Sequence, residues 1–231
     1  MVDKEQALFL KQKLAFWPRL TAPQRELLLS HTRALYCSPG ANIHSAAREC
    51  AGLLLVQSGE LRCYLLSEDG RDITLYRLGP GDMCVLSASC VLSSITFDVH
   101  IDAQQDSRVL LIDAPTFAAV MEENIYVENL ALRTGMERFS DVMWAMEQIL
   151  FMSFDRRLAI FLVDESAKRE TEHLALTHEQ VAKYMGSARE VVSRMLKHFS
   201  AEGMVALTRG GIQILDRKKL MSLTCEAGSK R

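Results

Sequence analysis

The sequence predicts an α+β protein in which an N-terminal β-roll, a long helix and a C-terminal winged helix-turn-helix follow one another. Strand-length apolar runs between turn signals predict the roll. A sustained three-four spacing of apolar residues predicts the long helix, and two short capped helices followed by a hairpin predict the last module. We expect these parts to occupy residues 1–115, 116–152 and 153–231.

The composition is that of an ordinary globular protein. The 231 residues are 48% hydrophobic and 24% charged, which leaves room for one large or two small domains. No stretch approaches the roughly 18 apolar residues of a membrane helix, and no basic segment leads into an apolar one at the N-terminus. We therefore expect a cytoplasmic protein without a membrane partner. Free thiols are expected at six scattered positions, namely Cys37, Cys50, Cys63, Cys84, Cys90 and Cys225.

Residues 34–112 have the pattern of an all-β barrel or roll. One or two short helices precede them, interrupted at Pro18 and Pro23. The apolar runs recur at roughly the 8–12 residue spacing of such folds, with glycine, proline and polar turn residues between them. The expected strands are 53–56, 61–66, 73–78, 95–101 and 109–112.

The next segment predicts a long helix with an apolar seam. Its residues alternate in steps of four and three: Ile125, Asn129, Leu132, Met136, Phe139, Met143, Met146 and Leu150. Such a stripe lines a core or meets its own copy, and its persistence over more than three heptads favours a dimer. Asn129 is the polar position, and it would set the register at some cost in stability.

Residues 177–199 predict a helix-turn-helix. Thr177-His178-Glu179-Gln180 is a capping box for a first short helix, and Gly186 can end it in a left-handed conformation. Ser187-Ala188-Arg189-Glu190 opens a second helix, which Gly203 ends. Two strand-like segments around Arg209-Gly210-Gly211 then form a hairpin, so the module is a winged helix.

The outer side of the second helix has the chemistry to recognise bases. Arginine can donate to guanine, glutamate can accept from cytosine, and serine can do either. Thr177 and His178 would meet phosphates, and Arg209 at the wing tip would touch the DNA backbone. In the alternative interpretation, Glu190 only caps Ser187 and the face is merely solvated. The predicted DNA-contacting residues are Thr177, His178, Ser187, Arg189, Glu190, Ser193, Arg194, Lys197 and Arg209.

The charge distribution supports a polyanion-binding C-terminus. The net charge of −2 conceals ten Lys and Arg residues against five Asp and Glu residues from Thr177 onward. The preceding part of the chain is correspondingly acidic. A basic segment on an acidic body favours nucleic-acid binding, although on its own this signal is weak.

Together these motifs resemble the CRP/FNR regulators, the catabolite activator protein and its relatives, over nearly the whole chain. The roll of that family, a double-stranded β-helix or jelly roll, has turns similar to Ser58-Gly59-Glu60, Glu68-Asp69-Gly70-Arg71 and Leu78-Gly79-Pro80-Gly81-Asp82. Its helix-turn-helix is similar to the segments 176–182 and 186–194.

The resemblance implies a homodimer that binds a two-fold symmetric DNA site and, if it activates transcription, RNA polymerase. By motif, Arg189, Glu190 and Arg194 would contact bases, and Ser193 resembles the FNR branch. A half-site of TGTGA or TTGAT character is implied, and the residues do not choose between them.

The chain departs from the family in its sensor region. No Lys or Arg lies between Arg77 and Arg108, so a cyclic nucleotide phosphate would lack its cation and cAMP is not expected. The N-terminal cysteine cluster of an iron–sulfur sensor is also missing, because the first cysteine is Cys37.

Three interpretations of the sensor stay open. A small-molecule pocket would use Cys84, Val85, Leu86, Ser87, Ser89, Cys90 and Thr96. Alternatively, two of the five cysteines from Cys37 to Cys90 are a redox pair, or one of them joins His44 or His100 in binding haem or a metal. The simplest alternative is that Cys63, Cys84 and Cys90 are small buried residues.

Catalytic motifs are absent from the sequence. It has no nucleophile elbow, P-loop or dinucleotide fingerprint, and Ala182 replaces the second histidine of a zinc-protease motif that begins at His178-Glu179. We therefore predict a sequence-specific transcriptional regulator that is not an enzyme and is controlled by an intracellular signal. The alternative is a thiol-redox or haem sensor in which DNA binding is secondary.

Overall fold

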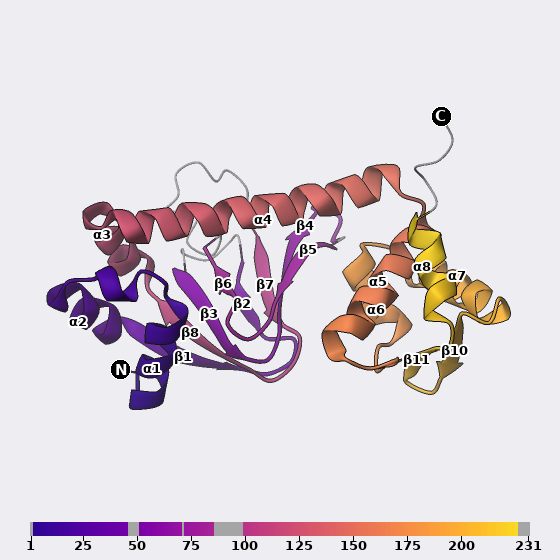
Figure 1. The fold of residues 1–231 in the computed structure, drawn as a ribbon, viewed down its shortest axis with the longest axis horizontal. Helices are drawn as coiled ribbons and strands as arrows, with labels where there is room; N and C mark the ends of the chain where they lie inside the picture. Colours follow the sequence, from indigo (N-terminus) through magenta and orange to yellow (C-terminus); the bar gives the residue numbers. More distant parts are fainter. Residues whose placement is uncertain (1, 46–50, 71, 86–98, 226–231) are drawn as a thin grey trace. The chain divides into compact units, whose positions relative to one another are not determined.

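The computed structural model describes residues 2–45, 51–70, 72–85 and 99–225 (Figure 1). The chain forms two compact units. The first comprises Met1–Arg71 and Leu75–Met143, and the second comprises Asp72–Thr74 and Trp144–Arg231. The order of elements confirms the predicted α+β fold with a roll, a long helix and a winged helix-turn-helix, whereas the boundaries expected at residues 115 and 152 stay predictions.

Three short helical segments begin the first unit: α1 (Lys4–Lys13), the 3-10 helix η1 (Trp17–Arg19) and α2 (Ala22–Ser30). Both α-helices start with a capping box, Asp3 with Gln6 and Thr21 with Gln24, which satisfies amide groups that the first turn leaves open. Their apolar faces join the core of the roll through Leu10, Leu14, Trp17 and Leu28.

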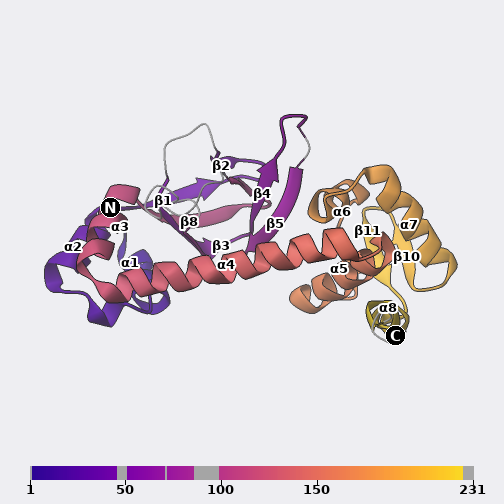
Figure 2. The same cartoon turned by 90° about the horizontal axis from the view of Figure 1, so that it is seen from above.

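In the part of the chain that the structure describes, the roll contains two four-stranded sheets (Figures 1 and 2). One has the order β1 (Thr32–Cys37), β8 (Ser107–Ile112), β3 (Leu53–Ser58) and β6 (Met83–Cys84). The other has the order β2 (Asn42–His44), β7 (His100–Ala103), β4 (Leu61–Leu66) and β5 (Asp72–Leu78).

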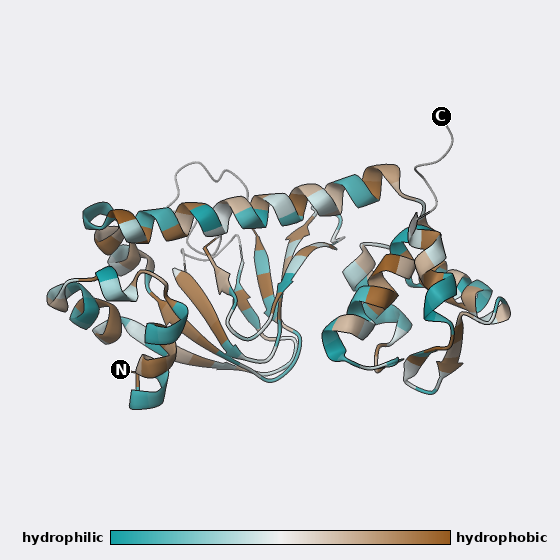
Figure 3. Ribbon diagram, viewed as in Figure 1, coloured by the Kyte–Doolittle hydropathy of each residue, from teal (hydrophilic) through white to brown (hydrophobic). Residues whose placement is uncertain are grey.

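The position of strand β3 between two apolar clusters explains why its sequence is a continuous apolar run rather than an alternating one. Leu54 and Val56 belong to the cluster that contains Ile101 of β7 in the other sheet, whereas Leu53 and Leu55 pack with the N-terminal helices. Both faces of the strand are therefore buried. Figure 3 shows the resulting concentration of hydrophobic residues on this strand.

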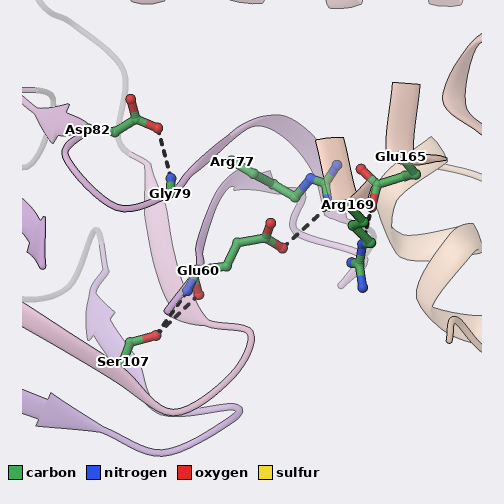
Figure 4. Close-up of polar contacts among 7 residues, drawn as sticks. All are labelled: Glu60, Arg77, Gly79, Asp82, Ser107, Glu165 and Arg169. Carbon is green, nitrogen blue, oxygen red and sulfur yellow. Dashed lines mark hydrogen bonds and ion pairs between the residues drawn. The ribbon is translucent and has the colours of Figure 1, made fainter. Parts of the chain in front are cut away.

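Two polar turns close the roll where the family resemblance places them (Figure 4). Ser107 Oγ accepts from the Glu60 amide at 3.2 Å, and the Glu60 carboxylate lies 3.3 Å from the Arg77 guanidinium. In the following turn, the Gly79 amide donates to Asp82 Oδ2 at 2.8 Å. These bonds satisfy groups that would otherwise be buried without a partner, so they hold the loops in one conformation.

Gly52 permits a close approach of two strands, which leads to a stability prediction. Its φ is +115°, and a Cβ atom there would overlap the Ile112 carbonyl oxygen. We expect Gly52→Ala to lower the free energy of unfolding by about 3 kcal/mol or more, because backbone must move. Gly70 is the control, because its φ is +77° but no atom lies within 4 Å of its Cβ position. Gly70→Ala should therefore lower the free energy of unfolding by only about 1 kcal/mol. Urea unfolding followed by circular dichroism measures both, and equal losses would contradict the prediction.

Helices α3 (Ala114–Glu123) and α4 (Ile125–Phe151) follow the roll. Asp113 caps α3, and Asn124 separates the two helices. The buried Asn124 side chain donates to the Arg19 carbonyl and to Gln24 Oε1, both at 3.1 Å, and it accepts from the Tyr126 amide. Asn124 therefore connects the start of α4 to the N-terminal helices.

One face of α4 packs on its own unit. Val127, Ala131 and Thr134 are buried there, and Val142 packs against the core of the roll. With 27 residues the helix is roughly 40 Å long. None of the helices in the described part of the chain is long and apolar enough to cross a membrane.

The second unit is a winged helix-turn-helix with flanking helices: α5 (Phe154–Arg169), β9 (His173–Leu174), α6 (His178–Met185), α7 (Arg189–Ala201), β10 (Val205–Thr208), β11 (Gly211–Ile214) and α8 (Arg217–Cys225). The hairpin β10–β11 was predicted, whereas β9, which pairs with β11, was not. The unit has its own core, which includes Leu158, Leu162, Leu174, Val181, Val192, Leu196, Phe199, Val205, Ile212 and Leu220.

Candidate nucleic-acid interface and signal region

The first helix of the helix-turn-helix has the predicted ends. Thr177 Oγ accepts from the Gln180 amide at 3.2 Å, and Gln180 Oε1 accepts from the Thr177 amide at 2.8 Å, which is the capping box. Gly186 ends α6 with a φ of +58°. The turn between α6 and α7 is therefore short, as a helix-turn-helix requires.

The second helix begins at Arg189, two residues later than its expected opening at Ser187. Its N-cap residue is Ala188, whose side chain makes no capping hydrogen bond. The alternative is thus wrong in making Glu190 the capping partner of Ser187, whereas its other part, a merely solvated outer face, is not tested by the helix boundary. Ser187 is half-buried in the turn.

The side chains of α7 divide into a buried face and an open face. Val192, Leu196 and Phe199 point into the core. A shallow hollow of about 400 Å³ lies on the opposite face. Its lining residues are Arg189, Glu190, Ser193, Arg194 and Lys197. Three cations and one carboxylate around an open hollow match the donors and acceptors that read base edges.

A second hollow, of about 340 Å³, joins α6, α7 and the wing. Its lining residues are Leu176, Thr177, His178, Glu179, Arg189, Thr208, Gly210 and Gly211. Arg189 lines both hollows. Arg209 is exposed between the two wing strands and lines neither of them.

Burial and the neighbouring cations Arg189 and Lys197 lower the pKa of His178. The imidazole therefore loses its proton more readily than a free histidine does. A nearby anion would have the opposite effect and favour the protonated form.

Arg157 on α5 positions α6, a role that sequence reasoning missed. Its guanidinium donates to the Met185 carbonyl at 2.6 Å, at the end of α6, and its half-burial lowers its pKa. No local motif identifies this residue, because its partner lies 28 positions later in the chain.

The interior of the roll contains a polar cluster of two thiols and a phenol. Cys63 on β4 and Cys84 on β6 come from different sheets, and both are fully buried. The Tyr76 hydroxyl lies 3.6 Å from Cys84 Sγ and also hydrogen-bonds to Cys63. Burial raises the pKa of Cys63 and of Tyr76, so both groups stay neutral at physiological pH.

Helix α4 contributes a cation to this cluster. The guanidinium carbon of Arg138 lies 5.0 Å from the centroid of the Tyr76 ring, and its Nη1 donates to Asp141 Oδ2 at 2.8 Å. The positive charges of Arg138 and Arg62 oppose the effect of burial on the pKa of Cys63. Arg138 therefore brings to the roll a positive charge that residues 78–107 do not supply. Arg138 could have been found, because it follows Ala131 and Thr134 at helical spacing on the inward face.

The comparisons with known proteins match both units. The description "Crp-like helix-turn-helix domain" matches residues 156–223, and "Cyclic nucleotide-binding domain" matches residues 35–124. A solved structure from Eubacterium rectale, assigned to the Crp/Fnr family of transcriptional regulators, is 44% identical with a TM-score of 0.87. The match covers 92% of this chain and 99% of that one. The chain belongs to the CRP/FNR family.

Curated CRP/FNR proteins are more distant. The transcriptional activator protein Anr of Pseudomonas aeruginosa is 25% identical over 176 residues, which cover 73% of this chain and 70% of the relative. The cyclic AMP receptor protein of Thermus thermophilus is 24% identical over 195 residues, which cover 84% and 89%. The relatives are transcriptional regulators, so this CRP/FNR chain is not an enzyme, and the predicted DNA-binding function is confirmed at that level.

The predicted sensor pocket of this CRP/FNR protein is described only in part. Cys84 and Val85 are buried, whereas Leu86, Ser87, Ser89, Cys90 and Thr96 lie outside the described residues. The pocket therefore stays a prediction.

Of the candidate redox and metal ligands, the structure brings Cys63 and Cys84 together around Tyr76, and the redox and metal interpretations stay predictions. Burial raises the pKa of Cys37 as well as that of Cys63, which disfavours the thiolate that redox chemistry needs. His44 is buried, and His100 stacks on Tyr64 at 5.3 Å. Among the described residues, no group of three or more His, Cys, Asp or Glu side chains could hold a metal. Cys50 lies outside them, as does the side chain of Cys225.

The predicted seam lies on the exposed side of α4. Met136 is 64% exposed, Phe139 56% and Leu150 65%, and Ile125, Leu132, Met143 and Met146 are exposed as well. Asn129 is exposed too, and its side-chain amide donates to the Ile125 carbonyl at 2.9 Å. The seam therefore does not line the core of its own CRP/FNR chain.

Proposed function

We propose that this CRP/FNR protein binds a two-fold symmetric DNA site as a homodimer and changes its DNA binding in response to a signal in the roll. The open face of α7 carries this proposal. Arg189, Glu190, Ser193, Arg194 and Lys197 surround one hollow on a winged helix-turn-helix, opposite a fully buried apolar face. That arrangement suits a helix that enters the major groove.

The homodimer is supported by the exposed seam of α4. A row of large apolar side chains with heptad spacing is costly in water, and a second copy of the same helix would cover it. Asn129 at one seam position would favour a single register. Two recognition helices would then meet half-sites one helical turn apart.

The signal is proposed to act at the interior of the roll next to α4. There Tyr76 contacts Arg138, so a ligand that displaces either group acts directly on the proposed dimer helix. The proposed dimer would have two arrangements, one that binds DNA and one that does not. By linkage, the signal changes the DNA affinity only if it binds these two arrangements with different free energies. RNA polymerase is a further partner if the protein activates transcription.

Selection from a random duplex pool tests the DNA-binding proposal. We expect enrichment of an inverted repeat whose half-site centres lie about 10–10.5 base pairs apart. We also expect the affinity to fall steeply as salt increases, because phosphate contacts release counterions. Enrichment of a single half-site, or no enrichment at all, would contradict the proposal.

A further inference from the structure

His178 is a titratable residue on the predicted DNA-binding face. It lines the hollow between α6, α7 and the wing, next to Arg189 and among residues that we predict to face DNA. The charged groups around it are Glu179 on its own helix and Arg189 and Lys197 on α7. The wing residues that line the hollow, Thr208, Gly210 and Gly211, carry no charge.

We propose that His178 makes the affinity of this protein for DNA depend on pH, by taking up a proton when a DNA phosphate enters this hollow. The inference rests on the proposed DNA-binding face. In the free protein, burial disfavours a charged His178, and Arg189 and Lys197 repel a third cation beside them, so neutral imidazole is favoured. A phosphate reverses the sign of the local field, so imidazolium becomes the favoured form and can donate to a phosphate oxygen.

The direction of the effect follows from linkage. Burial and the two cations lower the pKa of His178 in the free protein, and the phosphate raises it in the complex. Protons are therefore bound on association. The gain in affinity is complete below the free-state pKa and is lost as the pH rises through the pKa of the complex.

Fluorescence anisotropy with the full chain and a selected duplex, at constant ionic strength, tests the inference. From roughly pH 8 to roughly pH 6, we expect the affinity to rise by about threefold to tenfold per bound subunit. The salt slope should become steeper by about 0.9 per subunit, because one more cation meets a phosphate. His178→Gln should remove both pH effects.

Two further variants make the test specific. His178→Arg carries a permanent charge, so it should bind tightly at both pH values without a pH slope. His198→Gln is the matched control, because His198 is exposed on α7 near Asp155 and lines neither hollow. It should retain the pH dependence of the unmodified protein.

Some outcomes would overturn the inference and leave DNA binding intact. They are a pH-independent affinity of the unmodified protein, an unchanged pH slope in His178→Gln, or a pH slope that persists in His178→Arg. Failure of the unmodified protein to bind any duplex at either pH would overturn the proposed DNA-binding function as well.

Discussion

Met136→Asp combined with Met143→Asp should convert the proposed dimer into monomers. Both methionines are exposed on α4, 64% and 46% respectively, and lie seven residues apart on the seam. In a dimer, each substitution would place the carboxylates of the two subunits opposite one another in a desolvated seam. Together the two substitutions should weaken the free energy of dimerisation by several kcal/mol. Sedimentation equilibrium measures the mass, and DNA affinity should fall with it because one half-site is then bound alone.

The same two positions provide the control. Met136→Leu with Met143→Leu keeps the seam apolar and of similar volume, so the dimer should persist. Circular dichroism shows whether the aspartate variant is folded. A folded aspartate variant that remains dimeric would reject the seam as the contact between subunits.

Arg194→Ala should reduce specific DNA binding by about 1–3 kcal/mol and relax the preference at one base pair of each half-site. Arg194 lines the hollow on the open face of α7 and is exposed, so truncation should leave the fold intact. Competition among duplexes that differ at single positions measures the change. An unchanged preference at every position would contradict the assignment of Arg194 to base contacts.

Lys197→Ala on the same helix is the comparison for Arg194→Ala. Lys197 lines the same hollow, and its flexible ammonium group suits a phosphate contact. We expect uniform weakening across sequences and a salt slope that is shallower by about 1. A loss confined to one base pair would instead make Lys197 a base-contacting residue.

The sequence predicted those parts of the fold that local chemistry determines. The capping box at Thr177, the left-handed Gly186 and the three-four spacing of the seam are all properties of neighbouring residues, and the structure shows each of them. The predicted start of α7 at Ser187 was two residues too early. Ser187 is a good capping residue by type, but the turn after Gly186 places Ala188 at the cap.

Other features depend on contacts between distant segments and could not be predicted in this way. Arg157 reaches Met185 from another helix, and β9 exists only because it pairs with β11. The cation that approaches the roll interior is Arg138, far from the stretch in which a phosphate-binding residue was sought. Helical spacing could have predicted that Arg138 lies on the inward face of α4. It could not have predicted that Arg138 contacts Tyr76.

Asn124 has a practical consequence for engineering this protein. Its side-chain amide donates to the Arg19 carbonyl and to Gln24 Oε1, and its side-chain oxygen accepts from the Tyr126 amide at the start of α4. Removal of residues 1–24 would leave the buried Asn124 amide without these acceptors. It would also expose the apolar surface that Leu10 and Trp17 cover. The N-terminal helices therefore stabilise the start of the long helix. A shortened version of the sensor domain must retain them.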